Sequence, residues 1–500
     1  MKSIVHASWP PCPAPFNLAA HVLAAGAATP DRLALAVVRP TGAERWSYAR
    51  LIAAVRGCGT GLLAEGLQPG DRILLRLGNT PRFPVAYLGA LAAGLVPVVT
   101  FAAATAAEVS GMVAAVAPRA VLAEAGLALP DPCPPVIDAA RLAEWEGLAP
   151  CAYEMGAPDR PGYVVFTSGS SGRPTPVLHA HRAIWARGMM HRHWEGLTPA
   201  DRMLHAGAFN WTYTLGTGLL DPWTLGASAL VAGEGVTPEQ LPLLARRFDA
   251  TILAAVPGIY RRMLRAGLPP LPRLRHALSA GERLDPALRA AWQAATGTDL
   301  HEALGMSEVS TYLSGAPERP APMGTAGYPQ PGRRVAILDD DLAPVPRGTP
   351  GQLAVGAEDP GLALTYPGQQ DRFAARLKAG WFLTGDLAQM AEDGAITTLG
   401  RGDDLMNAGG FRVAPAEVEG ALAALPGLTE CAVCAVPTPS GAEIIAALYA
   451  GEADPADLAA GAAQLLSPYK CPRHWQRIDH LPRSANGKID RKALPGLVVL

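Results

Sequence analysis

Residues 163–174 read YVVFTSGSSGRP. A run of β-forming residues leads directly into a loop of Ser and Gly. Glycine lets the backbone take positive φ and come close to a ligand. Successive backbone N–H groups then form a concavity that binds anions, and the hydroxyl groups add donors. A flexible Ser/Gly linker would not follow a buried strand so tightly, so we expect this loop to bind a polyphosphate.

The loop differs from two other well-known motifs. No Gly-Lys-Ser/Thr follows it, so it is not a Walker P-loop. No Gly-x-Ser-x-Gly frame fits it, which excludes a hydrolase nucleophile elbow. Residues 59–64, GTGLLA, do match a dinucleotide-binding pattern, but they lie within a helical pattern and do not open a helix after a strand. We therefore reject a dinucleotide site there.

On both sides of the loop, helical and β-rich patterns alternate, which predicts an α/β fold. We expect helices over 48–63, 83–94 and 260–266, and strands over 72–76, 96–101 and 251–255. Between 324 and 400, short strands such as 334–338 and 351–355 predict a small β-rich subdomain. Beyond it we expect helices over 414–425 and 454–466, and strands over 430–436 and 444–449.

The predicted architecture has two domains. A large N-terminal domain of α/β layers covers residues 1–400 and includes the β-rich subdomain. Residues 401–404 follow a Gly and contain another, which suits a hinge. A small, mobile α+β C-terminal domain covers residues 405–500.

Composition and charge exclude several classes of protein. Of 500 residues, 49% are hydrophobic and 17% charged, which supplies a sizeable core and excludes a disordered chain. The net charge of −2 argues against a nucleic-acid partner or an anionic membrane surface. The longest apolar stretch, 85–104, carries Gly and Pro, so we expect a buried helix and strand there and no membrane span.

The cysteines and the N-terminus bear on the compartment. Seven cysteines at irregular positions do not form a disulfide framework. Cys431 and Cys434 lie in an extended stretch, where their side chains would point to opposite faces, so we expect no metal site at this CxxC. Residues 1–10 lack an apolar run and are not a secretory signal. We expect a cytoplasmic protein.

The loop at 163–174 resembles the phosphate-binding signature of the adenylate-forming (ANL) superfamily, which comprises acyl- and aryl-CoA synthetases, adenylation domains of peptide synthetases and luciferases. The resemblance covers nearly the whole chain, and the motifs follow the order of the family. They are the adenine-contacting turn (279–282, SAGE), the Gly-Met-Thr-Glu segment (305–308, GMSE), the ribose segment (380–386, GWFLTGD), the hinge (400–404, GRGDD), the thiol-transfer loop (409–413, GGFRV) and the lysine loop (482–489, PRSANGKI). Residues 69–71 with Asn79 also fit the N-terminal region of the family.

This resemblance implies ATP, Mg²⁺ and coenzyme A as cofactors, and it assigns roles residue by residue. Catalytic roles fall to Lys488, Ser307 and Glu308, with Glu308 also the metal ligand and Asp403 the hinge residue. The residues implied to bind the nucleotide or CoA are Thr167, Ser168, Gly169, Ser170, Ser171, Gly172, Gly281, Glu282, Asp386, Arg401, Gly409, Gly410 and Arg412.

The residue types suit the implied chemistry. Adenylation joins a carboxylate to the α-phosphorus of ATP, so two anions meet and the site needs positive charge and a metal. Lys488 can supply a mobile ammonium, Glu308 a hard oxygen for Mg²⁺ and Ser307 a hydroxyl for phosphate. Asp386 can accept both ribose hydroxyls, and Arg401 can reach the same sugar.

The sequence departs from the family in one place. The family loop continues Pro-Lys-Gly, and its lysine would ordinarily reach the β- and γ-phosphates, whereas residues 174–176 here read PTP. Thr175 keeps a hydroxyl and loses the charge. Two outcomes stay open, namely weaker ATP binding or compensation from Arg173, His179 or His181. A non-catalytic nucleotide- or acyl-binding homologue also stays open.

The acid substrate is expected in a compact, flat, apolar pocket. Residues 205–213 lie where the family places an aromatic gate, with which we align Trp211. The stretches 279–282 and 305–314 resemble the benzoate–CoA ligase branch, which implies a small aromatic or short-chain acid. The predicted pocket residues are Trp211, Ser279, Ala280, Ala303, Leu304 and Gly305.

The acceptor thiol has two candidates. No carrier domain follows residue 500 and no condensation domain precedes residue 1, so we expect a free-standing acid–CoA ligase. A free-standing adenylation enzyme that loads the phosphopantetheine of a separate carrier protein is the alternative, because both acceptors present the same thiol arm. A homodimer is compatible with the sequence.

The two loops at 409–413 and 482–489 predict that the half-reactions separate, because one active site does not hold both loops at once and the small domain should rotate between steps. Lys488→Ala should abolish pyrophosphate release and still convert supplied acyl-adenylate and CoA to thioester. Gly410→Leu should do the reverse, since a side chain there would obstruct the pantetheine path. Equal loss of both steps in Lys488→Ala, with an intact circular dichroism spectrum, would show that the loops do not divide the work.

Overall fold

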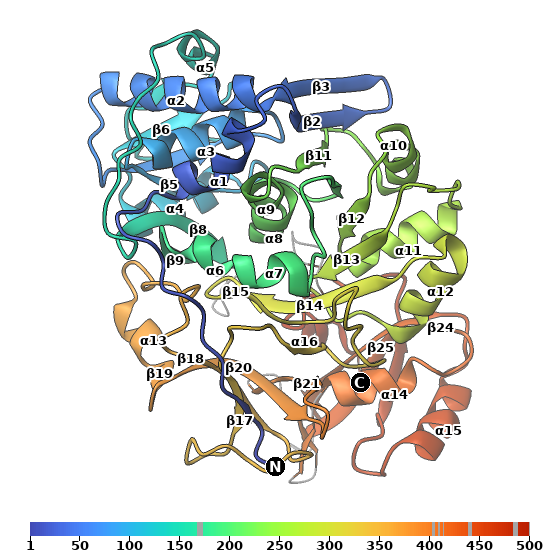
Figure 1. Ribbon diagram of the computed structural model, residues 1–500. Coiled ribbons are helices and arrows are strands. Elements are labelled where there is room, and N and C mark those ends of the chain that lie inside the picture. The colour runs from blue at the N-terminus through green and yellow to red at the C-terminus, as the bar shows by residue number, and fades with distance from the viewer. Residues whose placement is uncertain are drawn as a thin grey trace. The chain divides into compact units, whose positions relative to one another are not determined.

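The computed structural model describes residues 1–167, 174–402, 406–408, 411–413, 415–438, 443–483 and 489–499. The chain divides into two compact units. The large unit comprises Val5–Arg334 and Val355–Phe382, and the small unit comprises Met1–Ile4, Val335–Ala354 and Leu383–Leu500. Figure 1 shows the order of the elements along the chain.

A large, mostly parallel sheet forms the first layer of the large unit. Within its described residues, nine strands pair in the order β16-β15-β14-β13-β12-β10-β11-β2-β3. Their bounds are β2 Leu33–Arg39, β3 Gly42–Ser47, β10 Arg202–His205, β11 Ser228–Ala232, β12 Ile252–Ala255, β13 His276–Ala280, β14 Leu300–Met306, β15 Ser310–Ser314 and β16 Tyr328–Pro329. The strands from β2 to β14 in this order run parallel, and β3, β15 and β16 are antiparallel at the edges.

A second sheet carries the strand that opens the Ser/Gly loop. Its order is β7-β6-β4-β5-β8-β9, with β9 antiparallel to β8 and the other strands parallel. The bounds are β4 Arg72–Arg76, β5 Val96–Val99, β6 Ala120–Ala123, β7 Val136–Asp138, β8 Pro161–Thr167 and β9 Thr175–Ala180. The strands on either side of residues 168–173 are therefore antiparallel neighbours, and Thr167 pairs with Thr175 in register.

Helices connect and cover these parallel strands, as α/β layers require. They are α1 Leu18–Ala27, α2 Tyr48–Ala64, α3 Arg82–Ala92, α4 Ala106–Val116, α5 Arg141–Trp145, α6 Ala183–Ala186, α7 Gly188–His193, α8 Thr212–Leu215, α9 Asp221–Thr224, α10 Leu241–Arg247, α11 Pro257–Ala266, α12 Pro286–Thr296 and α13 Gln370–Ala374. A π-helical turn, Gly216–Leu220, joins α8 to α9. In Figure 1, α2 and α3 lie side by side, and α2 also packs against α5.

The segment predicted to be β-rich contributes a third sheet, in the order β1-β17-β18-β20-β19 with β21 paired to β20. Its strands are β1 Ile4–Val5, β17 Val335–Leu338, β18 Gly351–Gly356, β19 Leu377–Lys378, β20 Trp381–Met390 and β21 Ile396–Arg401. The division between the units falls within β18 and β20, so this sheet belongs partly to each.

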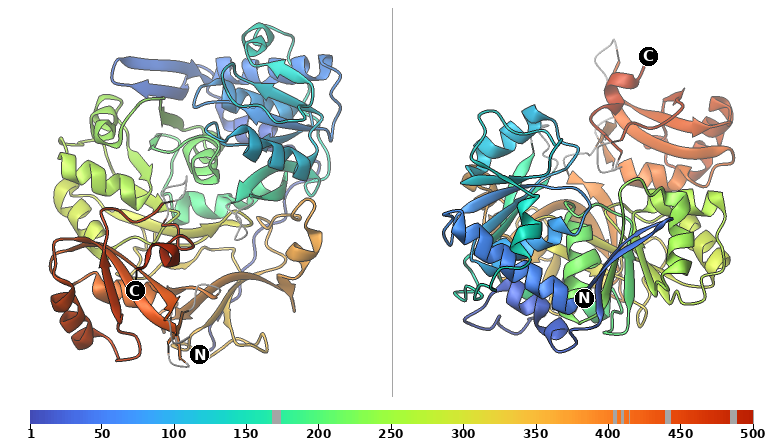
Figure 2. Two further views of the ribbon diagram at one scale, coloured as in Figure 1. Left: turned by 180° about the vertical axis from the view of Figure 1, so that it is seen from behind. Right: turned by 90° about the horizontal axis from the view of Figure 1, so that it is seen from above.

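The C-terminal part of the small unit is α+β, as predicted (Figure 2). Its elements are β22 Met406–Ala408, β23 Phe411–Val413, α14 Pro415–Leu422, β24 Leu428–Pro437, β25 Glu443–Gly451, α15 Pro455–Leu465, β26 His474–Arg477 and α16 Leu494–Leu497. On the sheet β24-β25-β26, Cys431 packs in the apolar cluster of α14 and α15 and Cys434 in the cluster of α16. The two thiols thus face opposite sides of the sheet, as the sequence predicted.

Predicted elements agree closely with the structure where the pattern is strongly periodic. The strand predicted over 72–76 is β4, and the helix predicted over 48–63 is α2. The helix predicted over 83–94 ends earlier, because Gly94 takes a left-handed φ of 78°. In the part of the chain that the structure describes, no helix has the length and apolar character needed to cross a membrane.

The rejected dinucleotide motif lies within α2, as the sequence indicated. Its glycines serve close packing. A Cβ at Gly59 would lie 2.5 Å from Sγ of Cys151, and one at Gly61 would lie 2.1 Å from the ring of Trp145. Both glycines are buried, so α2 packs against its neighbours through backbone that carries no side chain.

We predict opposite effects for the same substitution in two helices. Gly61→Ala should lower the free energy of unfolding by about 1–3 kcal/mol, because the new methyl group overlaps Trp145. Gly111→Ala in α4 should raise it by about 0.5–1 kcal/mol, because a Cβ there has no atom within 4 Å and alanine favours a helix. Denaturant unfolding of both variants measures the difference, and equal effects would contradict this account of the packing.

Candidate active site

Several residues predicted for the site in the large unit lie at the carboxyl ends of parallel strands. Thr167 ends β8, Ser279 and Ala280 end β13, and Ser307 follows β14 directly. β13 and β14 are neighbours in register, with Ala280 opposite Ala303. Ligands of open α/β sheets bind at this edge, because the loops that leave parallel strands meet there. The structure therefore brings the residues predicted on β13 and β14 together.

Trp211 lies in the loop between β10 and α8, and this loop is anchored from a distance. Asn79 Oδ1 accepts a hydrogen bond from the backbone N–H of Phe209 (2.7 Å), and its Nδ2 donates to the carbonyl of Ala232 (3.1 Å). The Trp211 ring meets Tyr213 edge to face, with 5.3 Å between centroids. Asn79, singled out from the sequence, thus positions the loop that carries the predicted gate.

The predicted adenine turn packs against Trp211. Gly281 takes a φ of 95°, and a Cβ there would lie 3.1 Å from the Trp211 ring. Trp211 packs against the apolar cluster that contains Ala280 and Ala303. Trp211, Ala280, Gly281 and Ala303 therefore lie close together. Position 281 requires glycine for two reasons, namely its left-handed backbone and the nearby Trp211 ring.

Glu308 is bound by two donors. Arg376 Nη1 lies 2.9 Å from Glu308 Oε1, and the Tyr366 hydroxyl donates to the same oxygen. The hydroxyl also accepts from Arg376 Nη1 at 2.9 Å. The backbone is tied as well, because the N–H of Ala363 donates to the Glu308 carbonyl (2.7 Å). This carboxylate is buried and its charge is compensated.

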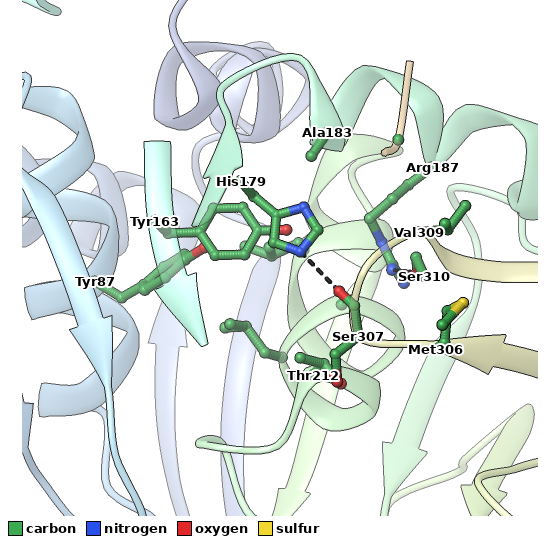
Figure 3. Close-up of a pocket in the computed structure, with 14 residues that line it drawn as sticks. Tyr87, Tyr163, His179, Ala183, Arg187, Thr212, Met306, Ser307, Val309 and Ser310 are labelled. Atoms are coloured by element: carbon green, nitrogen blue, oxygen red, sulfur yellow. Dashed lines mark hydrogen bonds between the residues drawn. The ribbon is translucent and has the colours of Figure 1, made fainter. Parts of the chain in front are cut away.

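The segment before Glu308 is held by a neutral histidine. His179 Nε2 donates to the carbonyl of Ser307 at 2.7 Å (Figure 3). Burial lowers the pKa of His179 to about 4, and it lowers the pKa of His181 to about 3. The sequence left both histidines open as cations that could replace the missing lysine at position 175. Burial argues against either histidine in that role, because it disfavours the charged form of each ring.

Thr175 has a cationic neighbour that the sequence did not reveal. It opens β9, it is buried, and its Oγ1 accepts a hydrogen bond of 3.0 Å from Arg372 Nη1. Arg372 lies on α13, a separate element of the large unit. The third residue considered for compensation, Arg173, lies outside the described residues.

A pocket opens beside Ser307, between the two sheets of the large unit (Figure 3). His179 stacks on Tyr163 with 4.9 Å between ring centroids, and Tyr87 meets Tyr163 at 5.9 Å. The lining residues are Tyr87, Tyr163, His179, Ala183, Arg187, Thr212, Leu215, Gly216, Leu220, Met306, Ser307, Val309, Ser310 and Gly361. Of the predicted site residues, Ser307 is in this lining, and the apolar pocket set is not.

A buried ion pair forms one wall of the pocket. Arg187 Nε donates to Asp221 Oδ1 at 2.7 Å, and Arg187 Nη1 donates to the Ser310 hydroxyl. A Cβ at Gly216 would lie 2.3 Å from the guanidinium, so only glycine leaves room for it. Sequence reasoning missed Arg187. The available signal was an arginine within the otherwise apolar pattern that became α6 and α7.

The same wall holds further titratable groups. Ligand atoms of His191, Glu195 and Asp221 all lie within 4.8 Å of one another. The Asp221 carboxylate already forms an ion pair with Arg187, which is permanently charged. Burial and the nearby Asp221 charge raise the pKa of Glu195 well above its usual range, which favours its neutral form. We therefore assign no metal to this cluster.

The small unit carries the predicted ribose residues. Asp386 on β20 pairs with Arg401 on β21, with 3.7 Å between Oδ1 and Nη1. Gly385 takes a φ of 83°, and a Cβ there would lie 2.8 Å from the Arg401 guanidinium. The predicted residues Ser168, Gly169, Ser170, Ser171, Gly172, Asp403, Gly409, Gly410 and Lys488 lie outside the described residues. Arg412 is described only as part of the β23 backbone.

Comparison with known proteins gives matches over most of the chain. The model of the AMP-binding enzyme family matches residues 23–366, and that of the AMP-binding enzyme C-terminal domain matches residues 417–488. A 3-hydroxybenzoate–CoA ligase from Aromatoleum sp. (strain CIB) is 30% identical, over 91% of this chain and 92% of its own length. A benzoate–CoA ligase from Thauera aromatica is 31% identical, over 90% of each chain. Among solved structures, ATP-bound MatB from Rhodopseudomonas palustris is similar, with a TM-score of 0.87 and 25% identity over 96% of this chain and 98% of that one.

The neutral state of His179 predicts a pH dependence of stability. Its folded pKa of about 4 lies below the value of about 6.5 expected when unfolded, so the unfolded chain binds the proton first. Because of His179, the free energy of unfolding should therefore decrease as the pH falls from about 6.5 to about 4, by up to about 1.4 kcal/mol per pH unit.

His179→Gln keeps a donor for the Ser307 carbonyl and removes the titrating ring, so its unfolding free energy should fall less steeply over that range. Denaturant unfolding at several pH values gives the slope, and substitution of the exposed His6 by Gln is the control. Identical slopes for wild type and His179→Gln would show that the folded ring titrates normally.

Proposed function

The chain belongs to the AMP-binding enzyme family, which contains the AMP-forming acid–CoA ligases, and we propose that it is an ATP-dependent carboxylic acid–CoA ligase. The proposed reaction converts acid and ATP to acyl-AMP and pyrophosphate, and then acyl-AMP and CoA to acyl-CoA and AMP. One observation carries the proposal. The strands β13 and β14 are parallel neighbours, so the predicted adenine turn after β13 and the residues Ser307 and Glu308 after β14 leave the same edge of the sheet.

Glu308 is the proposed Mg²⁺ ligand. Arg376 and Tyr366 both contact Oε1 of Glu308, and Oε2 is the second oxygen of the hard type that Mg²⁺ prefers. When bound, Mg²⁺ would neutralise phosphate charge. Arg376 and Tyr366 hold the orientation of the carboxylate. The Ser307 hydroxyl would bond to a phosphate oxygen.

The remaining nucleotide and thiol roles are proposed from the family motifs. Asp386 would accept the ribose hydroxyls with Arg401 beside it. Lys488 would bridge the acid and the α-phosphate, and the loop with Gly409 and Gly410 would admit the pantetheine arm of CoA. Rotation about Asp403 between the two steps is part of the same proposal.

The proposed acid is small and aromatic or short-chain. Two observations support this class. Trp211 packs over Gly281 and against the small side chains of Ala280 and Ala303, which favours a flat, compact ligand. The relatives from Aromatoleum and Thauera are named as ligases of hydroxybenzoate and benzoate.

Two alternatives differ in acceptor and in chemistry. A carrier-protein phosphopantetheine could replace CoA, because both present the same arm. A non-catalytic binding homologue is favoured by the missing lysine at position 175, although Arg372 beside Thr175 argues against it. We propose a cytoplasmic location because all seven cysteines are free thiols, as in a reducing compartment.

A paired assay tests the function. Pyrophosphate release with a panel of benzoate-sized, branched and long-chain acids should show turnover with the smallest members. Thioester should then form with free CoA. No release with any acid would favour the binding homologue, and release without CoA thioester would favour a carrier protein.

Trp211→Ala should widen the acid pocket. Larger acids should gain relative to benzoate-sized ones, by roughly 1–3 kcal/mol in kcat/KM for a methylene-scale change. Trp211→Phe is the matched control, since it keeps an aromatic ring and should keep the ranking. If Trp211→Ala preserves the ranking of acids, then Trp211 is a packing residue and the gate lies elsewhere.

A further inference from the structure

The pocket beside Ser307 has polar atoms in its wall that lack a protein partner. Tyr87 and His179 both line it, and neither the Tyr87 hydroxyl nor His179 Nδ1 has a hydrogen-bond partner among the residues that the structure describes. Tyr87 is fully buried, and His179 is only 3% exposed. Because a buried polar group without a partner is costly, these two atoms indicate that the pocket receives a polar group.

His179 determines which kind of polar group the pocket can take. Its Nε2 lies 2.7 Å from the carbonyl oxygen of Ser307, which can only accept, so Nε2 carries the ring proton. Burial lowers the pKa of His179 to about 4, so Nδ1 has a free lone pair at neutral pH. The group that enters must therefore donate a hydrogen bond to Nδ1. The Tyr87 hydroxyl can donate to the same group.

The pocket does not suit an anion, because the charge of Arg187 is already compensated. Its Nε donates to Asp221 Oδ1 at 2.7 Å, and its Nη2 donates to Asp221 Oδ2. The other bonds of the guanidinium go to the hydroxyl groups of Ser310 and Thr217. A carboxylate or phosphate oxygen would enter without a counter-charge and could not donate to His179. The group that fits is neutral.

The size of the pocket limits the group further. The volume is about 30 Å³, which holds one water-sized group and little more. Tyr163 and His179 lie on one side of this space, and Arg187 and Met306 lie on the other (Figure 3). A neutral group of this size that both donates and accepts a hydrogen bond is a hydroxyl group or a water molecule.

The pocket adjoins the apolar surface that is proposed for the acid. Thr212 lines the pocket, and Tyr213, the next residue of α8, belongs to the cluster against which Trp211 packs. Met190 of the same cluster has its Sδ 3.9 Å from the hydroxyl oxygen of Ser310, which lines the pocket. A flat acid on the apolar surface would therefore lie beside the pocket, and a substituent of that acid could enter it.

We propose that the pocket binds a hydroxyl group of the acid substrate, which donates to His179 Nδ1 and accepts from the Tyr87 hydroxyl. The inference rests on the proposed function and narrows its acid to the hydroxylated members of the class. A hydroxyl group on the acid gives both buried atoms a partner and brings no charge into the pocket. A water molecule offers the same hydrogen bonds, and the choice of acids in the experiment separates the two.

Rates of pyrophosphate release with benzoate and with the ortho, meta and para hydroxybenzoates test the inference. One hydroxybenzoate should exceed benzoate in kcat/KM by about 10-fold, since it makes two hydrogen bonds that benzoate lacks. Tyr87→Phe keeps the ring and removes one of these bonds, so it should lower that ratio by about 3-fold or more. Tyr153→Phe is the matched control and should leave the ratio unchanged, because Tyr153 packs beside Arg56 and is not in the lining.

Thermal unfolding gives a second readout. The preferred hydroxybenzoate should raise the midpoint more than benzoate does, and Tyr87→Phe should reduce this difference. Without an acid, Tyr87→Phe should unfold at no lower temperature than wild type, because it removes a buried hydroxyl group that lacks a partner.

Two results would overturn the inference while the proposed function stands. One is a kcat/KM for benzoate that equals or exceeds those of all three hydroxybenzoates. The other is an equal loss for benzoate and the hydroxybenzoates in Tyr87→Phe, which would show that the pocket holds water. If no acid supports pyrophosphate release, the proposed function fails and the inference fails with it.

Discussion

Three arginine–carboxylate pairs hold the turn that follows β14, and the rest of the candidate active site depends on that turn. The pairs are Arg187–Asp221, Arg333–Asp359 and Arg376–Glu308. Arg187 reaches the Ser310 hydroxyl, and Arg333 donates to the carbonyl of Thr311 (3.0 Å). Ser310 takes a φ of 72°, which a residue with a Cβ tolerates only where its surroundings determine the backbone. Because the three carboxylates are buried, loss of an arginine would leave a buried charge without its partner, which is costly.

Histidine and arginine side chains respond differently to burial in this site. Imidazole loses its proton when buried, so burial lowers the pKa of His179 and of His205, and His179 serves as a neutral donor to the backbone. Guanidinium keeps its charge in the same surroundings. Positive charge in the interior of the large unit is therefore carried by arginine, as at Arg187.

Two neighbouring surfaces of different character lie at the candidate active site. The apolar one consists of Trp211 with the small residues at the ends of β13 and β14. The polar one is the pocket with Arg187 and the stacked pair Tyr163 and His179. Asn79 connects them to the frame of the large unit, because it ties the loop before Trp211 to the end of β11.

Periodicity and loop composition are local properties of the chain, so the elements and the motifs could be predicted from the sequence. The strand over Arg72–Arg76, the helix that hides the Gly59 motif, the opposite faces of Cys431 and Cys434, and Glu308 at the end of its strand are all readable in this way. Which charged side chains meet depends on how the elements pack. Thr175 and Arg372 are 197 residues apart, and Arg187 and Asp221 come from helices whose contact depends on a glycine between them. Such pairs arise where packing brings distant elements together, and no local pattern in the chain encodes the distance between two side chains.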